Sequence, residues 1–127
     1  MGIDHYDPFK APDAEQWLAT DEAERIRLVL DYHTRTGVEL PNADMHAMLH
    51  VAVENQIALA DETPVQLKAR QLMMQGLDRH QTIHAIASVL IKYLYDAGHE
   101  RMPAGDPGQN YYAALRRLNA RKWLRSG

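Results

Sequence analysis

The stretch DRHQTIHAIASVLIKYLYDAG, residues 78–98, decides the fold class of this chain. Its apolar side chains recur at the spacing of one helix face, and Asp78 and Gly98 are typical of residues that begin and end a helix. We therefore expect this stretch to be the central helix of the protein. The apolar positions are Ile83, Ile86, Ala87, Leu90, Ile91 and Leu94.

The sequence on either side contains further helical patterns and no strand pattern. No segment alternates polar and apolar residues between hairpin turns, so no sheet is expected. Residues 1–12, with Pro8 and Pro12, are predicted to form an extended arm, and Asp13 with Gln16 indicates a capping box for a short helical turn. Longer helices are expected from Thr20 to Gly37, over residues 43–60, from Thr63-Pro64 to Gly76, and after a loop at residues 102–108.

These patterns predict one all-α domain over residues 1–127, a compact helical bundle or orthogonal array of about five to six helices. A length of 127 residues with 46% hydrophobic content is enough for one core. The chain contains no cysteine, which excludes disulfides and thiolate ligands and is compatible with a reducing compartment. It also lacks a secretory signal pattern and a run of about 20 apolar residues, so we expect a soluble, cytoplasmic protein.

The charge of the chain is unevenly distributed. The net charge is -3, but acidic residues dominate residues 4–31, and every charged residue after Asp106 is basic. The basic C-terminal helix could bind phosphates with the help of Trp123, or it could pair with the acidic N-terminal region. The second reading is favoured, because the total charge is wrong for a dedicated nucleic-acid binder.

The most unusual feature is a pair of histidines on each of two predicted helices, His46 with His50 and His80 with His84. Residues four apart lie on one face of a helix, so the members of each pair point the same way and border an apolar stripe. Glu54 follows His50 by four residues and therefore lies on the same helix face as this pair. If the two stripes face each other, four imidazoles and one carboxylate converge between two helices.

A metal ion would explain such a convergence. Buried imidazoles cost free energy unless their nitrogens have partners, and clustered imidazoles repel one another when protonated. Coordination by neutral nitrogens removes both problems, and this donor set suits a transition metal ion, with zinc or iron first, better than magnesium or calcium. The predicted ligands are His46, His50, Glu54, His80 and His84.

Three further predictions concern single residues. Glu54 is expected to be a ligand, a partner that orients an imidazole, or a general base beside a metal-bound water, with the first two favoured. His33 lies on the apolar face of its own helix and is either an extra ligand or a packed histidine at the core margin, and the second interpretation is favoured. The amide of Gln56 is expected to be buried and hydrogen-bonded to another helix.

A reading without metal stays open. In it the histidines form a buried polar network, and the exposed helix faces bind a partner or a second copy of the chain. Broad apolar stripes on short helices predict a homodimer under either reading. The chain has no glycine-rich phosphate loop, serine elbow or His-Glu-x-x-His motif, so the usual residues of nucleotide hydrolysis and nucleophilic catalysis are missing, and the question of enzymatic activity stays open.

The segment HAMLHVAVENQ, residues 46–56, followed by RHQTIH, residues 79–84, resembles a family of small bacterial α-helical proteins, a domain of unknown function with paired His-x3-His helices. The similarity covers about residues 43–97 and implies a helical fold with a paired-histidine site, but no activity. Glu54 departs from the family pattern, because Asn55 stands directly before Gln56. The matching residues are His46, His50, Gln56, His80 and His84.

A weaker resemblance is to hemerythrin-type di-iron bundles. The pairs His50-x3-Glu54 and His80-x3-His84 are similar to the central ligand motifs of that family. The last helix of that family supplies a histidine followed five residues later by aspartate, and this chain has no such spacing.

Overall fold

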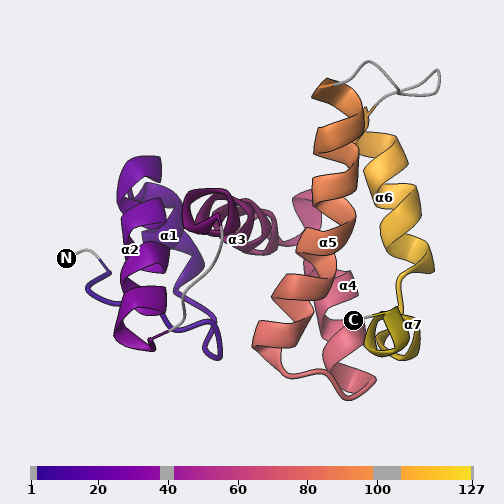
Figure 1. Cartoon of the computed structure of the whole chain (residues 1–127), viewed down its shortest axis with the longest axis horizontal. Coiled ribbons are helices and arrows are strands. Elements are labelled where there is room, and N and C mark those ends of the chain that lie inside the picture. Colours follow the sequence, from indigo (N-terminus) through magenta and orange to yellow (C-terminus); the bar gives the residue numbers. More distant parts are fainter. Residues whose placement is uncertain (1–2, 38–41, 99–106, 127) are drawn as a thin grey trace.

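The computed structural model describes residues 3–37, 42–98 and 107–126, and all regular structure within them is helical (Figure 1). The predicted all-α fold is therefore confirmed. No helix in the described part of the chain is long and apolar enough to cross a membrane. The elements are α1 (Ala14–Ala19), α2 (Glu22–Arg35), α3 (Ala43–Ala58), the 3-10 helix η1 (Ala60–Glu62), α4 (Val65–Met74), α5 (Arg79–Gly98), α6 (Pro107–Arg117) and α7 (Ala120–Ser126).

Local capping residues set several helix ends as predicted. The Asp13 carboxylate accepts a hydrogen bond from the backbone N–H of Gln16 at 2.9 Å, and that of Asp78 accepts one from Gln81 at 2.7 Å. These carboxylates satisfy amides that have no partner inside the helix. Gly76 follows α4 with a φ of 109°, a left-handed conformation that glycine adopts without a steric penalty.

The C-terminal part differs from the prediction, because one expected helix is two. The side chain of Asn119 accepts a hydrogen bond from the backbone N–H of Lys122 at 2.8 Å and so begins α7 as a separate helix. Residues 102–106 of the expected loop lie outside the described residues. Residues 107–108 belong to α6 rather than to a loop.

The central helix is α3, not α5 as predicted. Figure 1 shows α3 between α1 and α2 on one side and α4 and α5 on the other. Residues on its two sides belong to two hydrophobic cores. Ala47 and Val51 pack in the core that contains Trp17, and Val53 packs in the core that contains Ile83. The apolar residues of α3 therefore lie on two sides of the helix rather than along one stripe, and one of them, Met45, is 44% exposed.

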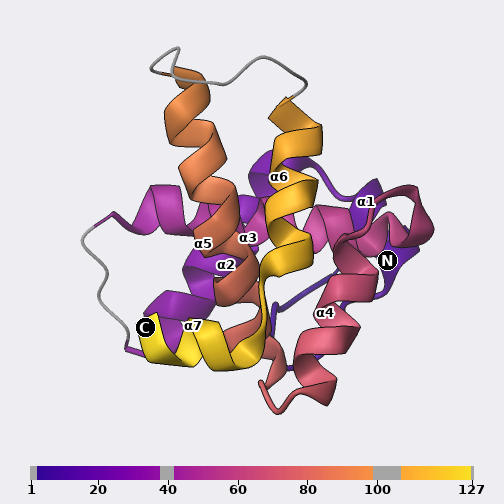
Figure 2. The ribbon, with the colours of Figure 1, turned by 90° about the vertical axis from the view of Figure 1, so that its right-hand side faces the viewer.

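The basic helices form the other end of the molecule. Figures 1 and 2 show α5 and α6 side by side, and Figure 1 places α6 and α7 opposite α1 and α2. The predicted pairing of the basic end with the acidic N-terminal region is therefore wrong. Instead, the buried Lys68 donates hydrogen bonds to the carbonyls of Arg116 and Leu118, and the Tyr111 hydroxyl donates to Gln56 on α3 at 2.7 Å.

Candidate metal centre

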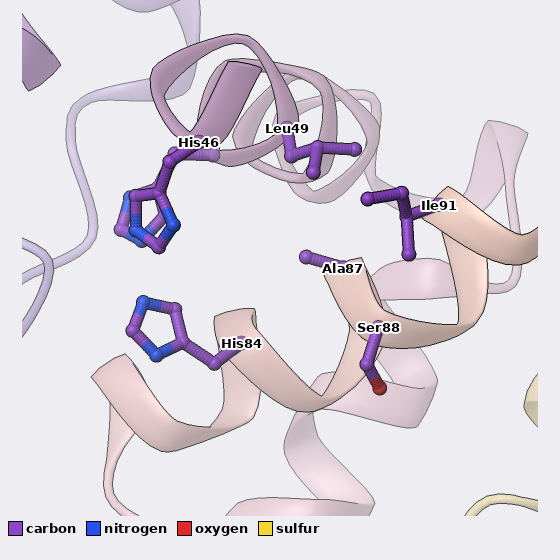
Figure 3. Close-up of a pocket in the computed structure, with 7 residues that line it drawn as sticks. His46, Leu49, His84, Ala87, Ser88 and Ile91 are labelled. Carbon is purple, nitrogen blue, oxygen red and sulfur yellow. The ribbon is translucent and has the colours of Figure 1, made fainter. Parts of the chain in front are cut away.

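The two histidine pairs face each other across the interface between α3 and α5. The ring centroids of His46 and His84 lie 5.0 Å apart, and those of His50 and His80 lie 5.4 Å apart. Figure 3 shows His46 and His84 pointing toward one another from the two helices. Two stretches that are distant in the sequence thus bring their imidazoles to one place.

A fifth histidine, His33 from α2, joins the same cluster. Its side chain is 5% exposed, and its ring centroid lies 4.8 Å from that of His46 and 5.5 Å from that of His50. His33 is packed as expected, and its place beside His46 and His50 favours the alternative prediction, that it is an extra ligand. The signal in the sequence is its position on the apolar face of its helix, four residues after Val29.

The five histidines form two groups of three that share one member. His33, His50 and His80 offer nitrogens that lie within 4.8 Å of one another, and the same is true of His46, His50 and His84. Ligand nitrogens bound at about 2.1 Å from one ion lie roughly 3 to 4 Å apart. Small movements of the side chains would therefore close either group around a metal ion.

Hydrogen bonds determine which nitrogen of two of these rings holds the proton. His33 Nδ1 lies 2.9 Å from the carbonyl oxygen of Val29, which can only accept. His50 Nδ1 lies 3.3 Å from the hydroxyl of Tyr6, which gives its own proton to Glu54 at 2.5 Å. Nδ1 therefore donates in both rings, and Nε2 keeps a free lone pair, the form that binds a metal.

All five rings leave Nε2 buried and without a hydrogen-bond partner among the described residues. A buried polar atom without a partner is unusual and costs free energy. The imidazoles therefore do not satisfy one another, as a metal-free polar network would require. A metal ion among them would supply the missing partner to several of these nitrogens at once.

The cluster also favours neutral rings. Burial, followed by the neighbouring histidines, lowers the pKa of His50 to about 2 and the pKa of His84 to about 4. Burial also lowers the pKa of His33, His46 and His80. At neutral pH the lone pairs are therefore available to a metal ion without a proton having to leave first.

Glu54 belongs to neither group of three. Its carboxylate accepts hydrogen bonds from two nitrogens of the Arg79 guanidinium, each at 2.7 Å, and from the Tyr6 hydroxyl. This places Glu54 where it orients His50 through Tyr6, which is one of its predicted roles. Because Arg79 and Tyr6 engage both of its oxygens, the structure does not place it as a ligand.

The N-terminal arm covers this side of the cluster. Tyr6 is 2% exposed, its backbone carbonyl accepts a hydrogen bond from Arg35, and the carbonyl of Pro8 accepts one from Arg79 at 3.0 Å. The Phe9 ring packs edge-on against His80 with centroids 5.3 Å apart. The sequence analysis missed Tyr6 and Arg79 as parts of the site, although the opposite charges of Glu54 and Arg79 flank the two histidine pairs.

A pocket of about 190 Å³ adjoins the cluster between α3 and α5 (Figure 3). The rings of His46, His50 and His84 form one side of it. The rest is mostly apolar, and none of the remaining lining residues carries a charge. These residues are Leu49, Ala87, Ser88 and Ile91.

Comparison with protein-family models identifies the family of this chain. A family model described as "Domain of unknown function (DUF1841)" matches residues 12–117. The match includes all five clustered histidines, Glu54 and Arg79, whereas Tyr6 precedes it. No curated protein and no solved structure matches the chain.

Proposed function

This chain belongs to the DUF1841 family, a domain of unknown function, and we propose that it binds a transition metal ion in its histidine cluster. The observation that supports the proposal most is the set of five buried Nε2 atoms without hydrogen-bond partners. Imidazole nitrogens bind zinc or iron(II) better than they bind magnesium or calcium, which prefer oxygen ligands. The reading as a metal-free polar network is less favoured, because it leaves these nitrogens unsatisfied.

We expect one ion per chain rather than two. The two groups of three share His50, and a bridge between two ions would need both nitrogens of that ring. Its Nδ1 already faces the Tyr6 hydroxyl, so only Nε2 is free for a metal. His46, His50, His80 and His84 remain the proposed ligands, and His33 is added to them.

Metal content is the direct test. Protein purified without a nickel column, then offered zinc or iron(II) and desalted, should hold about one ion per chain by elemental analysis. Structural zinc sites bind strongly enough to survive such handling. A content below about 0.1 ion per chain with both metals would contradict the proposal.

The hydrogen bond from His50 to Tyr6 provides a second test. Tyr6→Phe removes the hydroxyl that holds the Nδ1 proton of His50 but leaves the pair of Glu54 and Arg79 in place. Removing such outer partners typically weakens metal binding by about 10- to 100-fold, and we expect a loss of this size for zinc in a chelator competition. The hydroxyl of Tyr32 makes no hydrogen bond to the cluster, although its ring packs against His33 and His80, so Tyr32→Phe is the matched control and should bind zinc normally.

The homodimer and the cytoplasmic location stay predictions. Large apolar side chains on α3 and α5 are exposed, and one of them, Ile91, lines the pocket, which is compatible with a covered face in a dimer. They are Met45, Met48, Ile91 and Leu94.

A further inference from the structure

We propose that a second site, the pocket between α4 and α6, binds a small phosphate monoester. This pocket shares no residue with the histidine cluster, so the inference does not depend on the proposed metal ion. Three features support it: a buried lysine without a carboxylate partner in the described part of the chain, an arginine beside this lysine, and a wall that is mostly apolar.

The pocket has a volume of about 230 Å³ and lies where α4 and α6 pack against each other. Two of its lining residues, Lys68 and Arg116, carry a positive charge, and none that the structure describes carries a negative one. Its charge therefore favours an anionic ligand. The other lining residues are Pro64, Leu67, Gln71, Tyr112 and Leu115.

The ammonium group of Lys68 is held by neutral acceptors. Lys68 is 8% exposed, and its Nζ donates hydrogen bonds to the carbonyls of Leu118 at 3.0 Å and of Arg116 at 3.4 Å. These carbonyls lie at the C-terminal end of α6, which carries roughly half a negative charge and so compensates the ammonium only in part. Burial alone lowers the pKa of Lys68, and no carboxylate of the described residues opposes this shift. An anion in the pocket would supply the missing counter-charge.

Arg116 adds a second positive charge to the same pocket. It is exposed, and its guanidinium forms no ion pair with any residue that the structure describes. A guanidinium binds a phosphate through two parallel hydrogen bonds, whereas an ammonium acts as a compact point charge. A phosphate monoester carries about two negative charges at neutral pH, which matches the two cations better than the single charge of a carboxylate does.

The apolar wall indicates what the phosphate is attached to. Leu67 is 72% exposed although its side chain is large and apolar, and Leu115 on the facing helix is buried. An apolar group of the ligand would cover Leu67 and gain free energy from the area that is removed from water. The pocket is smaller than the roughly 300 to 1,000 Å³ of most ligand sites, so we expect a small aryl or alkyl phosphate.

Phenyl phosphate is a suitable probe, because it joins a phosphate to a small apolar ring. A calorimetric titration at low ionic strength should show one molecule bound per chain. Benzoate, with a single negative charge, should bind several-fold more weakly, and uncharged benzyl alcohol should not bind at the same concentrations. Equal affinity for benzyl alcohol would overturn the proposal, because charge would then not select the ligand. Equal affinity for benzoate would overturn the assignment to a phosphate.

Two neighbouring arginines provide a variant and its matched control. Arg116→Gln should weaken the binding of phenyl phosphate by about 10-fold or more, because a charge-assisted hydrogen bond to the anion is lost. Arg117→Gln removes the same charge from the next residue of α6, which is exposed and does not line the pocket, and should bind phenyl phosphate like the natural chain. Equal losses in both variants would overturn the proposal and indicate a general attraction of polyanions such as nucleic acids to the basic helices.

Two further variants complete the test. Lys68→Met removes the buried ammonium but keeps a side chain of similar length, and it should also lose affinity by about 10-fold or more. If circular dichroism shows that this variant is not folded, the comparison of Arg116→Gln with Arg117→Gln decides. His50→Ala removes the histidine that both groups of three share and should bind phenyl phosphate normally. A loss of binding in His50→Ala would assign the phosphate to the proposed metal ion and overturn the inference.

Discussion

His50→Ala is expected to weaken zinc binding by at least about 100-fold, more than any other single histidine substitution. Free energies of structural zinc binding of about 10 to 16 kcal/mol, spread over four ligands, correspond to roughly 3 kcal/mol per ligand, or about 100-fold in affinity. His50 is common to both groups of three, and its ring lies next to all four other rings. Its loss therefore leaves neither group complete.

The comparison with other histidines makes this result specific. His84→Ala and His33→Ala should each have a smaller effect, because each of them leaves the other group of three complete. His5→Ala is the control, since His5 is exposed and lies outside the cluster. Affinities are measured by competition with a chromophoric chelator, and circular dichroism verifies that each variant is folded. Equal zinc affinities for all four variants would rule out the proposed ligand set.

The metal-free protein is expected to lose stability steeply as the pH falls below about 6.5. The folded state holds the pKa of His50 near 2, whereas the same ring in the unfolded chain has its ordinary pKa of about 6.5. Below that pH the unfolded state takes up a proton that the folded state does not, so protons favour unfolding. The free energy of unfolding is therefore highest above the pKa that the His50 ring has in the unfolded chain. It declines as the pH falls toward the pKa of that ring in the folded protein.

The expected size of this effect is large for a small domain. Each pH unit below about 6.5 lowers the free energy of unfolding by about 1.4 kcal/mol for one such histidine, so His50 alone costs about 2 kcal/mol at pH 5. His84, with a pKa of about 4, acts in the same direction. Because small domains are stable by only about 5 to 15 kcal/mol, acid unfolding should follow at a mildly acidic pH.

Urea unfolding of metal-free protein at pH 7.5 and pH 5.0 measures this loss. Between these two pH values the His50→Ala variant should lose about 2 kcal/mol less of its free energy of unfolding than the natural chain. Saturating zinc should stabilise the natural chain at pH 7.5, because the ion binds the folded state. An unchanged unfolding midpoint between the two pH values would show that the rings are not held neutral in the folded protein.

The helices and the direction of the histidine pairs could be predicted because both depend on neighbours along the chain. Capping by Asp13 and Asp78 requires residues only three positions away, and the four-residue spacing within each pair defines one helix face regardless of the fold. The same local rule could not predict that α3 is buried on two sides. That depends on which helices pack against it.

The sequence alone thus determined an all-α chain with two pairs of imidazoles, each aimed along one face of its helix. Only the tertiary structure decided that His33 joins them, that Glu54 reaches His50 through Tyr6, and that Arg79 balances the carboxylate. The reason is physical: helix formation and side-chain direction follow from contacts a few residues apart, whereas a shared site is created by contacts between helices that are distant in the sequence.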